Sequence, residues 1–329
     1  NNVFWQEISP SVEFFEKLKR ARNKFPETTE SVQTLIIPSE IYQSVLKKTI
    51  EDLDCFLKHE KAIKLVFSLR SIARDKGVEP DRSLQASPIT KTQSGRIQYY
   101  WKKLLRENID ASIAFEELYK AGISKSESWV GLVEKLRGWQ VRCAILISAF
   151  TGMRKSELLA IPLNGLKTLS TESGPIPVVW STTTKLEANG APRFTKWVTS
   201  SAVEAAFKVA KIITEGALEW SGDRRISAIQ EKEIPLFLSI EHGLSGTPHP
   251  LFSYTTASFC LKTISEDIYE KELYVTENDI AEISWFLYEE RVSSAIKQGM
   301  AWPLTFHQFR RSMTVYAAAS GMVSYPVLK

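Results

Sequence analysis

The feature that most constrains the fold is a pair of β-rich runs in the middle of a chain otherwise patterned for helices. The runs are residues 177–184 and 193–199, and Asn189-Gly190 between them is a strong hairpin signal. Apolar residues recur with helical spacing over 39–74, 139–150, 201–215, 277–299 and 306–320. Helices on both sides of one small antiparallel sheet predict a mainly α fold of the α+β class, not an alternating β-α-β chain.

The chain is long enough for two domains. Its 329 residues exceed the length of about 250–300 residues near which a single hydrophobic core stops growing. The small and polar stretch over residues 121–126 is the best candidate for a boundary. We therefore expect a helical, basic N-terminal domain over residues 1–125 and a second domain over residues 126–329.

Composition excludes several classes of protein. Cys55, Cys143 and Cys260 are odd in number and far apart, and with the four histidines they show neither disulfide nor zinc spacing. The longest apolar run, residues 143–150, is far shorter than the ~20 residues that cross a bilayer. The first residues show no basic segment followed by an apolar one, as a signal peptide would. These features predict an intracellular protein with no structural metal and no membrane contact.

Positive charge is concentrated between Lys61 and Arg106, where eleven Lys or Arg stand against three acids. Tyr99, Tyr100 and Trp101 lie among these bases. Such a surplus is expected of a surface that follows a phosphate backbone, although a solvated helical face explains the same count. The residues that we expect to contact DNA are Lys61, Lys64, Lys91, Arg96, Lys102, Lys103 and Arg106.

Three further segments hold residues suited to chemistry on a phosphate. The first is Thr-Gly-Met-Arg-Lys-Ser-Glu-Leu over 151–158, where Gly152 can end the preceding helix in a left-handed conformation. The second is Lys185, which enters the Asn189-Gly190 turn, and the third is His-Gln-Phe-Arg-Arg over 307–311. Each has an ordinary explanation by itself, as a surface charge or a surface pair on a helix.

Together, in this order, the three segments resemble the signatures of the tyrosine site-specific recombinases, the phage-integrase family. That family has Thr-Gly-(apolar)-Arg-x-(Ser/Gly)-Glu-(Leu/Ile) after a helix, which residues 151–158 match. A lysine in a β-hairpin follows, and Lys185 lies 31 residues beyond Arg154. The third signature, His-x-(apolar)-Arg before a small-residue helix, is matched over 307–321.

The resemblance implies an enzyme that cuts and rejoins DNA through a 3′-phosphotyrosine intermediate, with neither metal nor cofactor. Arg154 and Arg310 would clamp the non-bridging oxygens of the scissile phosphate, because two guanidiniums offer paired charge-assisted hydrogen bonds. His307 would hydrogen-bond the phosphate or assist the proton on the nucleophile. Lys185 would protonate the leaving 5′ hydroxyl, and Glu157 would orient the arginine or histidine side chains.

The resemblance also implies partners and a location. Residues 1–125 would be the core DNA-binding domain and residues 126–329 the catalytic domain. The partner would be double-stranded DNA, bound by a homotetramer on paired sites during integration or excision of a mobile element. The location would be the bacterial cytoplasm, at the nucleoid.

The match departs from the family near residue 329. The family's tyrosine nucleophile lies further past the third signature than the 19 residues that separate Arg310 from Lys329. We expect it beyond Lys329, so that residues 1–329 bind DNA without cleaving it. Tyr316 is expected to serve packing, and Tyr325 is a weaker candidate for the nucleophile.

Some assignments stay open. Lys196 and Arg193, on the returning strand, are secondary candidates for the hairpin acid. A type IB topoisomerase shares this set of active-site residues. A catalytically inactive regulator that binds DNA with a recombinase fold is the other alternative.

Overall fold

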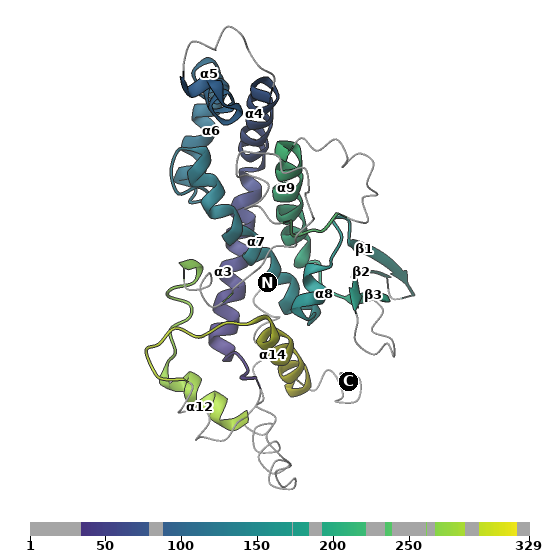
Figure 1. The fold of residues 1–329 in the computed structure, drawn as a ribbon. Helices are drawn as coiled ribbons and strands as arrows, with labels where there is room; N and C mark the ends of the chain where they lie inside the picture. The colour runs from purple at the N-terminus through teal and green to yellow at the C-terminus, as the bar shows by residue number, and fades with distance from the viewer. Residues whose placement is uncertain are drawn as a thin grey trace. The chain divides into compact units, whose positions relative to one another are not determined.

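The computed structural model describes residues 34–78, 88–172, 174–183, 193–221, 234–238, 261, 267–286 and 296–320 (Figure 1). The helices before the sheet are α3 (Ser39–Lys58), α4 (Glu60–Val78), η2 (Pro88–Lys91), α5 (Gln93–Glu107), α6 (Ile109–Lys120), α7 (Trp129–Thr151) and α8 (Lys155–Leu159). The strands are β1 (Leu166–Thr171), β2 (Gly174–Thr183) and β3 (Arg193–Val198), followed by α9 (Val203–Ser221), α12 (Glu277–Phe286) and α14 (Phe306–Ala319). This order confirms the α+β prediction: helices, one small antiparallel sheet, then helices.

The sheet has one strand more than the sequence pattern indicated. Its order is β1-β2-β3, with both neighbouring pairs antiparallel. The extra strand β1 pairs Leu166 with Val179, while Trp180 of β2 lies opposite Lys196 of β3. Most of β1 is exposed and polar, so it lacks the alternation of apolar residues that marks a half-buried strand.

A helix was expected over residues 277–299. For its last described residues, 296–299, this prediction is wrong. Residues 296–305 are not helical. Gly299 has a φ of 79°, a left-handed conformation that a helix interior does not accept. Val275 donates its N–H to Met300 O at 3.0 Å and accepts from Gly299 N at 2.8 Å, which holds this segment as a turn.

The described chain forms two compact units. The first unit takes residues 34–50, 145–155 and 261–320 of the described part, and the second takes 51–144 and 156–238. The expected domain boundary over 121–126 falls in the turn between α6 and α7. The assignment of DNA binding to residues 1–125 and of catalysis to 126–329 stays a prediction.

In the second unit, α4 packs against α5, α6 and α9 around a buried arginine. Arg70 of α4 is 8% exposed, and its guanidinium carbon lies 5.1 Å, 5.4 Å and 4.8 Å from the ring centres of Trp101, Trp129 and Trp220. Burial lowers the pKa of Arg70 to about 10, so the side chain stays charged at neutral pH. One turn later, Arg74 donates to the last carbonyls of α9, including Glu219 O at 2.8 Å.

In the first unit, α14 packs against the segment that leads into α3. Ser312 accepts the N–H of Ile37 at 2.8 Å, and the hydroxyl of Tyr316 donates to Ile37 O at 2.5 Å. The ring of Tyr42 lies 5.9 Å from each of the rings of Phe309 and Tyr316. One face of α14 is thereby fixed by both polar and aromatic contacts.

Candidate functional site

The first signature forms a tight turn between α7 and α8. Thr151 bonds back to Ile147 O at 2.7 Å and accepts the N–H of Met153 at 3.3 Å. Gly152, with a φ of 61°, ends α7 in the left-handed conformation, which glycine adopts without steric cost. Met153 is fully buried, and the turn leads directly to the half-buried Arg154. The presence of threonine and glycine in the signature is thus explained by the local structure of this turn.

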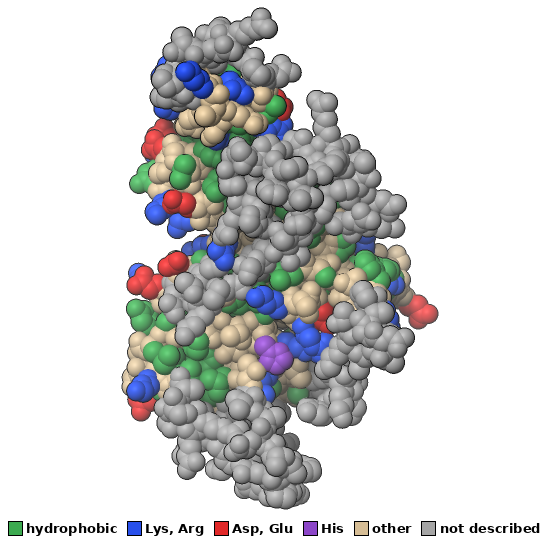
Figure 2. All heavy atoms as spheres, viewed as in Figure 1, with side chains coloured by type: hydrophobic (Ala, Val, Ile, Leu, Met, Phe, Trp, Pro, Cys, Tyr) green, Lys and Arg blue, Asp and Glu red, His purple; other side chains and the backbone are tan. Residues whose placement is uncertain are grey.

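The third signature opens α14. Thr305 is the N-cap residue, and the Gln308 side chain accepts the Thr305 N–H at 2.7 Å in a capping box. His307 and Arg310 therefore lie in the first turns of the helix, where His307 is exposed and Arg310 half-buried. In the same view as Figure 1, Figure 2 shows a histidine beside Lys or Arg side chains over the position of α14.

The two signatures meet within the first unit. Arg310 donates from Nη1 to Gly152 O at 2.6 Å, although the two residues are 158 positions apart in the sequence. A Cβ added to Gly152 would overlap Met313 Cε and lie 3.9 Å from Arg310 Cγ. Met313 Cε is the end of a flexible side chain that can move, so it is the φ of 61° that favours glycine here, and Arg154 follows two residues later. The structure thus brings the segments of Arg154, His307 and Arg310 together.

Glu157 lies in α8, which belongs to the second unit. Its side chain is 3% exposed and accepts the hydroxyl proton of Thr183 at 2.8 Å. Its backbone carbonyl accepts from Ser181 at 2.5 Å, so α8 is bonded twice to the end of β2. This contact ties Glu157 to the strand that leads to Lys185; orientation of the arginines by Glu157 stays a prediction.

The expected hairpin lysine, Lys185, and the Asn189-Gly190 turn lie outside the described residues. Of the two secondary candidates, Lys196 has its Nζ 4.6 Å from the centre of the Trp180 ring, a cation–π contact on the sheet. Arg193 is exposed at the start of β3.

Tyr316 meets the expectation of a packing residue. It is 5% exposed, its hydroxyl is hydrogen-bonded, and burial raises its pKa above the ordinary tyrosine range. A tyrosine held in this way is a poor nucleophile, because its phenolate is strongly disfavoured. Tyr325 lies outside the described residues.

The expected DNA-contacting residues fall into two groups. The exposed ones are Lys61, Lys64, Lys91, Lys102, Lys103 and Arg106. Lys64 forms an ion pair with Glu60, one helical turn earlier, at 2.6 Å, and both side chains are at least partly exposed to solvent. Exposed helical pairs of this kind contribute little stability, so they leave the lysine able to exchange its partner for a phosphate.

Arg96 differs from this exposed group. It donates from Nε to Gly77 O at 3.0 Å, from Nη2 to Val78 O at 3.3 Å and from Nη1 to Lys91 O at 3.2 Å. Two of these carbonyls lie at the C-terminal end of α4, where a positive charge also interacts favourably with the negative end of the helix dipole. Arg96 therefore fastens α5 to the end of α4, a role that charge counting alone did not reveal.

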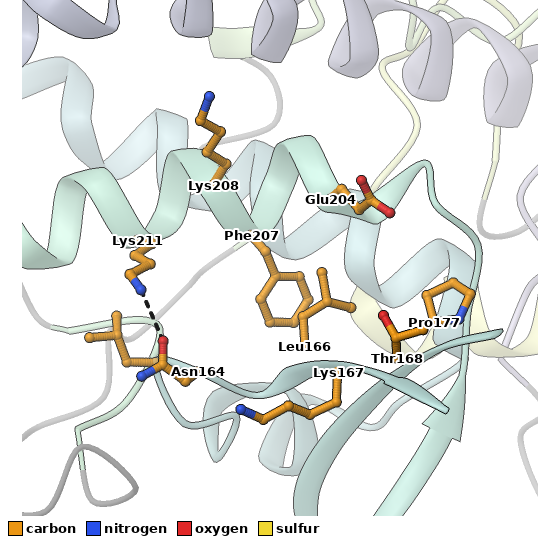
Figure 3. Close-up of a pocket in the computed structure, with 10 residues that line it drawn as sticks. Asn164, Leu166, Lys167, Thr168, Pro177, Glu204, Phe207, Lys208 and Lys211 are labelled. Carbon is orange, nitrogen blue, oxygen red and sulfur yellow. Dashed lines mark hydrogen bonds between the residues drawn. The ribbon is translucent and has the colours of Figure 1, made fainter. Parts of the chain in front are cut away.

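A groove of about 600 Å³ in the second unit lies between β1 and α9 and holds none of the signature residues. Figure 3 shows Phe207 directed toward Leu166, while the side chains of Lys208 and Glu204, on the same helix, extend away from Phe207. Lys211 donates to Asn164 Oδ1 at 2.9 Å, and Lys208 pairs with a carboxylate of α4 at 3.1 Å. Two of the groove's three lysines are therefore engaged within the chain.

Broader comparisons give no family. No protein-family model matches the chain, and no curated protein matches it either. Among the described residues, no three His, Cys, Asp or Glu side chains gather where they could hold a metal ion. None of the helices described here combines the length and apolar character that crossing a bilayer requires.

Proposed function

We propose that the protein is a tyrosine site-specific recombinase that cuts and rejoins double-stranded DNA. One observation carries the proposal: the hydrogen bond from Arg310 to Gly152 O brings together two signature segments that are far apart in the sequence. An arginine at a helix end is an ordinary contact in itself, as Arg96 at the end of α4 illustrates; the support comes from the identity of the two segments, which are the first and third signatures. The proposal includes a DNA-binding role for residues 1–125, assembly as a tetramer on paired sites, and action at the bacterial nucleoid.

The chemistry follows from the residue types. A phosphodiester in its five-coordinate transition state gathers negative charge on two non-bridging oxygens. Arg154 and Arg310 are permanently charged and planar, so each offers a two-pronged grip on an oxygen pair. Fixed donors of this kind accelerate a reaction by about 10²–10³ each. His307, exposed beside Arg310 on α14, supplies a further hydrogen bond or a proton relay.

Binding rests on other residues. Exposed lysines and arginines of α4 and α5, such as Lys61, Lys102 and Arg106, contact phosphates along the duplex. Each neutralised phosphate releases counterions, so affinity depends on salt with a slope of about −0.9 per contact. Cleavage depends on one phosphate and affinity on many, so different mutations should affect the two quantities separately.

The test uses the natural full-length protein and duplexes that this protein selects from a random pool. In Arg154→Lys and Arg310→Lys, we expect the covalent protein–DNA complex to form at least 100-fold more slowly, about the value of one fixed donor. DNA affinity should stay within a few-fold, because charge is kept and binding is spread over many contacts. Denaturing gels measure the first quantity and fluorescence anisotropy the second.

The matched control is Arg106→Lys, on α5, which should change neither quantity by more than about two-fold. DNA binding with no covalent complex in the parent protein would contradict the proposal and favour a regulator that only binds DNA. Equal loss of binding and cleavage in the two site variants would also contradict it.

A further inference from the structure

Helix α14 has two distinct faces. Phe309, Ser312 and Tyr316 are buried and follow one another at helical spacing. His307 is exposed and Arg310 half-buried, and both lie on the other side of the helical wheel. Whatever fixes the buried face therefore sets the direction of the two proposed site residues.

A carboxylate from the segment before α14 reaches this buried face. Glu282 of α12 accepts from the Ser39 N–H at 3.0 Å and from the Ser39 hydroxyl at 2.9 Å, both at Oε2, and the same N–H lies 3.2 Å from Oε1. Its other oxygen, Oε1, lies 3.0 Å from the Tyr316 hydroxyl. Glu282 thus joins α12 to the start of α3 and to α14.

The number of protons shared among Glu282, Tyr316 and Ser39 decides whether Glu282 is charged. The Tyr316 hydroxyl has one proton and two oxygen neighbours, Ile37 O at 2.5 Å and Glu282 Oε1 at 3.0 Å. A backbone carbonyl has no proton to offer, so the shorter contact takes the tyrosine proton. The contact between Tyr316 and Glu282 then lacks a proton unless the carboxyl group provides it.

We infer that Glu282 is a neutral carboxylic acid that donates its proton to Tyr316, and that it is the positioning residue for helix α14. The chain of donors then runs from Glu282 Oε1 to Tyr316 Oη and on to Ile37 O, while Glu282 Oε2 accepts both donors of Ser39. Every polar atom of the cluster has a suitable partner in this arrangement.

The surroundings favour the neutral form. Burial is the largest influence and raises the pKa of Glu282 above its ordinary value of 4.5; the hydrogen bonds with Ser39 and Tyr316 lower it in part, and the nearby Asp279 raises it slightly. Asp279 is itself occupied, since it accepts from the N–H and the hydroxyl of Thr276. From α3 and α14 the facing groups are Ser39, Tyr42 and Tyr316, and no cation among the described residues pairs with Glu282.

The direction of the pH effect follows from this shift. A carboxyl group whose pKa is higher in the folded than in the unfolded chain stabilises the fold fully below the unfolded pKa. That stability is lost as the pH rises through the folded pKa. Glutamine cannot ionise and mimics the neutral acid, with an N–H donor toward Tyr316 and an oxygen toward Ser39.

The experiment compares the full-length parent with Glu282→Gln, using Glu277→Gln, an exposed position on the same helix, as control. At about pH 6, above the ordinary carboxyl range, the infrared spectrum of the parent should contain a neutral carboxylic acid band that Glu282→Gln lacks. The stability of Glu282→Gln relative to the parent should rise with pH. The control should keep the band and the pH dependence of the parent.

Carboxylate bands in place of the neutral band would overturn the inference. So would a Glu282→Gln variant that is less stable than the parent at neutral pH and recovers on acidification.

The positioning role rests on the proposed function, and DNA cleavage tests it. Glu282→Gln should keep cleavage within about three-fold, while Glu282→Ala, which removes the bonds to Ser39 and Tyr316, should lower it at least ten-fold with DNA affinity retained. Equal cleavage by Glu282→Ala and the parent would overturn the positioning role. If the parent itself forms no covalent complex, the recombinase proposal fails, while the infrared spectrum still decides the protonation of Glu282.

Discussion

Helices α14 and α5 carry the two halves of the proposed activity, and the protein anchors them in different ways. Directed polar bonds hold α14: Ser312 and Tyr316 bond to Ile37, and Arg310 bonds to Gly152. Only Ile97 and Trp101 of α5 are buried, and Trp101 stacks against the guanidinium of Arg70. Tyr42 adds aromatic contacts to α14, and Arg96 adds three hydrogen bonds to α5. The helices therefore differ in balance: three residues spread along α14 make directed bonds to other segments, while those of α5 come from Arg96 near its start, and aromatic packing holds Trp101.

The difference suits the role that the proposal gives to each helix. Hydrogen bonds weaken steeply with angle, so a helix held by several of them keeps its side chains in one orientation. Aromatic and apolar contacts are less directional, and they suffice for a helix whose lysines meet many phosphates. A catalytic helix needs the first kind of anchor, because small displacements of reacting groups are costly.

The largest effect is expected at Arg70. Nε and Nη1 of Arg70 are buried without a hydrogen-bond partner among the described residues, so the three tryptophan rings are its main support. Arg70→Ala removes both the cation and the volume between the rings, and should lower the free energy of unfolding by about 3–5 kcal/mol. Urea denaturation followed by tryptophan fluorescence measures this loss.

Arg70→Met separates volume from charge. It fills most of the same space without a charge to desolvate, so its stability should stay within about 1 kcal/mol of the parent's. If Arg70→Met is as unstable as Arg70→Ala, the cation itself holds the rings, and the contrast between packed and polar anchors fails for the second unit.

The sequence predicted the fold class and the neighbourhood of the first and third signatures. Periodicity and the Asn-Gly turn gave the overall order of helices, sheet and helices, because both are local signals. Strand β1 was missed because its exposed residues, such as Lys167 and Ser170, do not alternate.

The supports of the site could not be predicted in the same way. Glu282 and Tyr316 are 34 positions apart, and Ile37 is 279 positions from Tyr316. Such pairings depend on tertiary contacts, for which a single sequence has no pattern. A surplus of charge likewise could not tell an arginine that bonds to backbone carbonyls from one that faces solvent.

A smaller effect is expected at Gly152, where the polar anchor of α14 meets the first signature. Gly152→Ala forces an L residue to a φ of 61° and places its Cβ against Met313, so we expect a loss of about 2 kcal/mol in the free energy of unfolding. Met313→Ala in the same chain should return part of this loss, because it removes the overlap but not the backbone strain. Thermal unfolding of both variants measures the two contributions, and no recovery at all would mean that Met313 does not limit the approach of α14.

The smallest effects are expected at Arg96 and Lys102 on α5. The two variants should nevertheless differ clearly, one in stability and the other in the salt dependence of DNA binding. Arg96 uses three nitrogens on backbone carbonyls, while Lys102 is exposed. Arg96→Ala should therefore cost about 1 kcal/mol of stability and leave the salt dependence of DNA binding nearly unchanged. Lys102→Ala should cost less than about 0.5 kcal/mol and reduce the salt slope by about 0.9, the value of one phosphate contact.

Binding measured over a series of salt concentrations, together with urea denaturation, gives both quantities for each variant. A reduced salt slope in Arg96→Ala, with stability unchanged, would reverse the assignment: Arg96 would then contact DNA in solution and release the end of α4. An unchanged slope in Lys102→Ala would instead remove this part of α5 from the DNA interface. The two residues lie on the same helix and both side chains carry one positive charge, so the comparison sets an engaged cation against an exposed one.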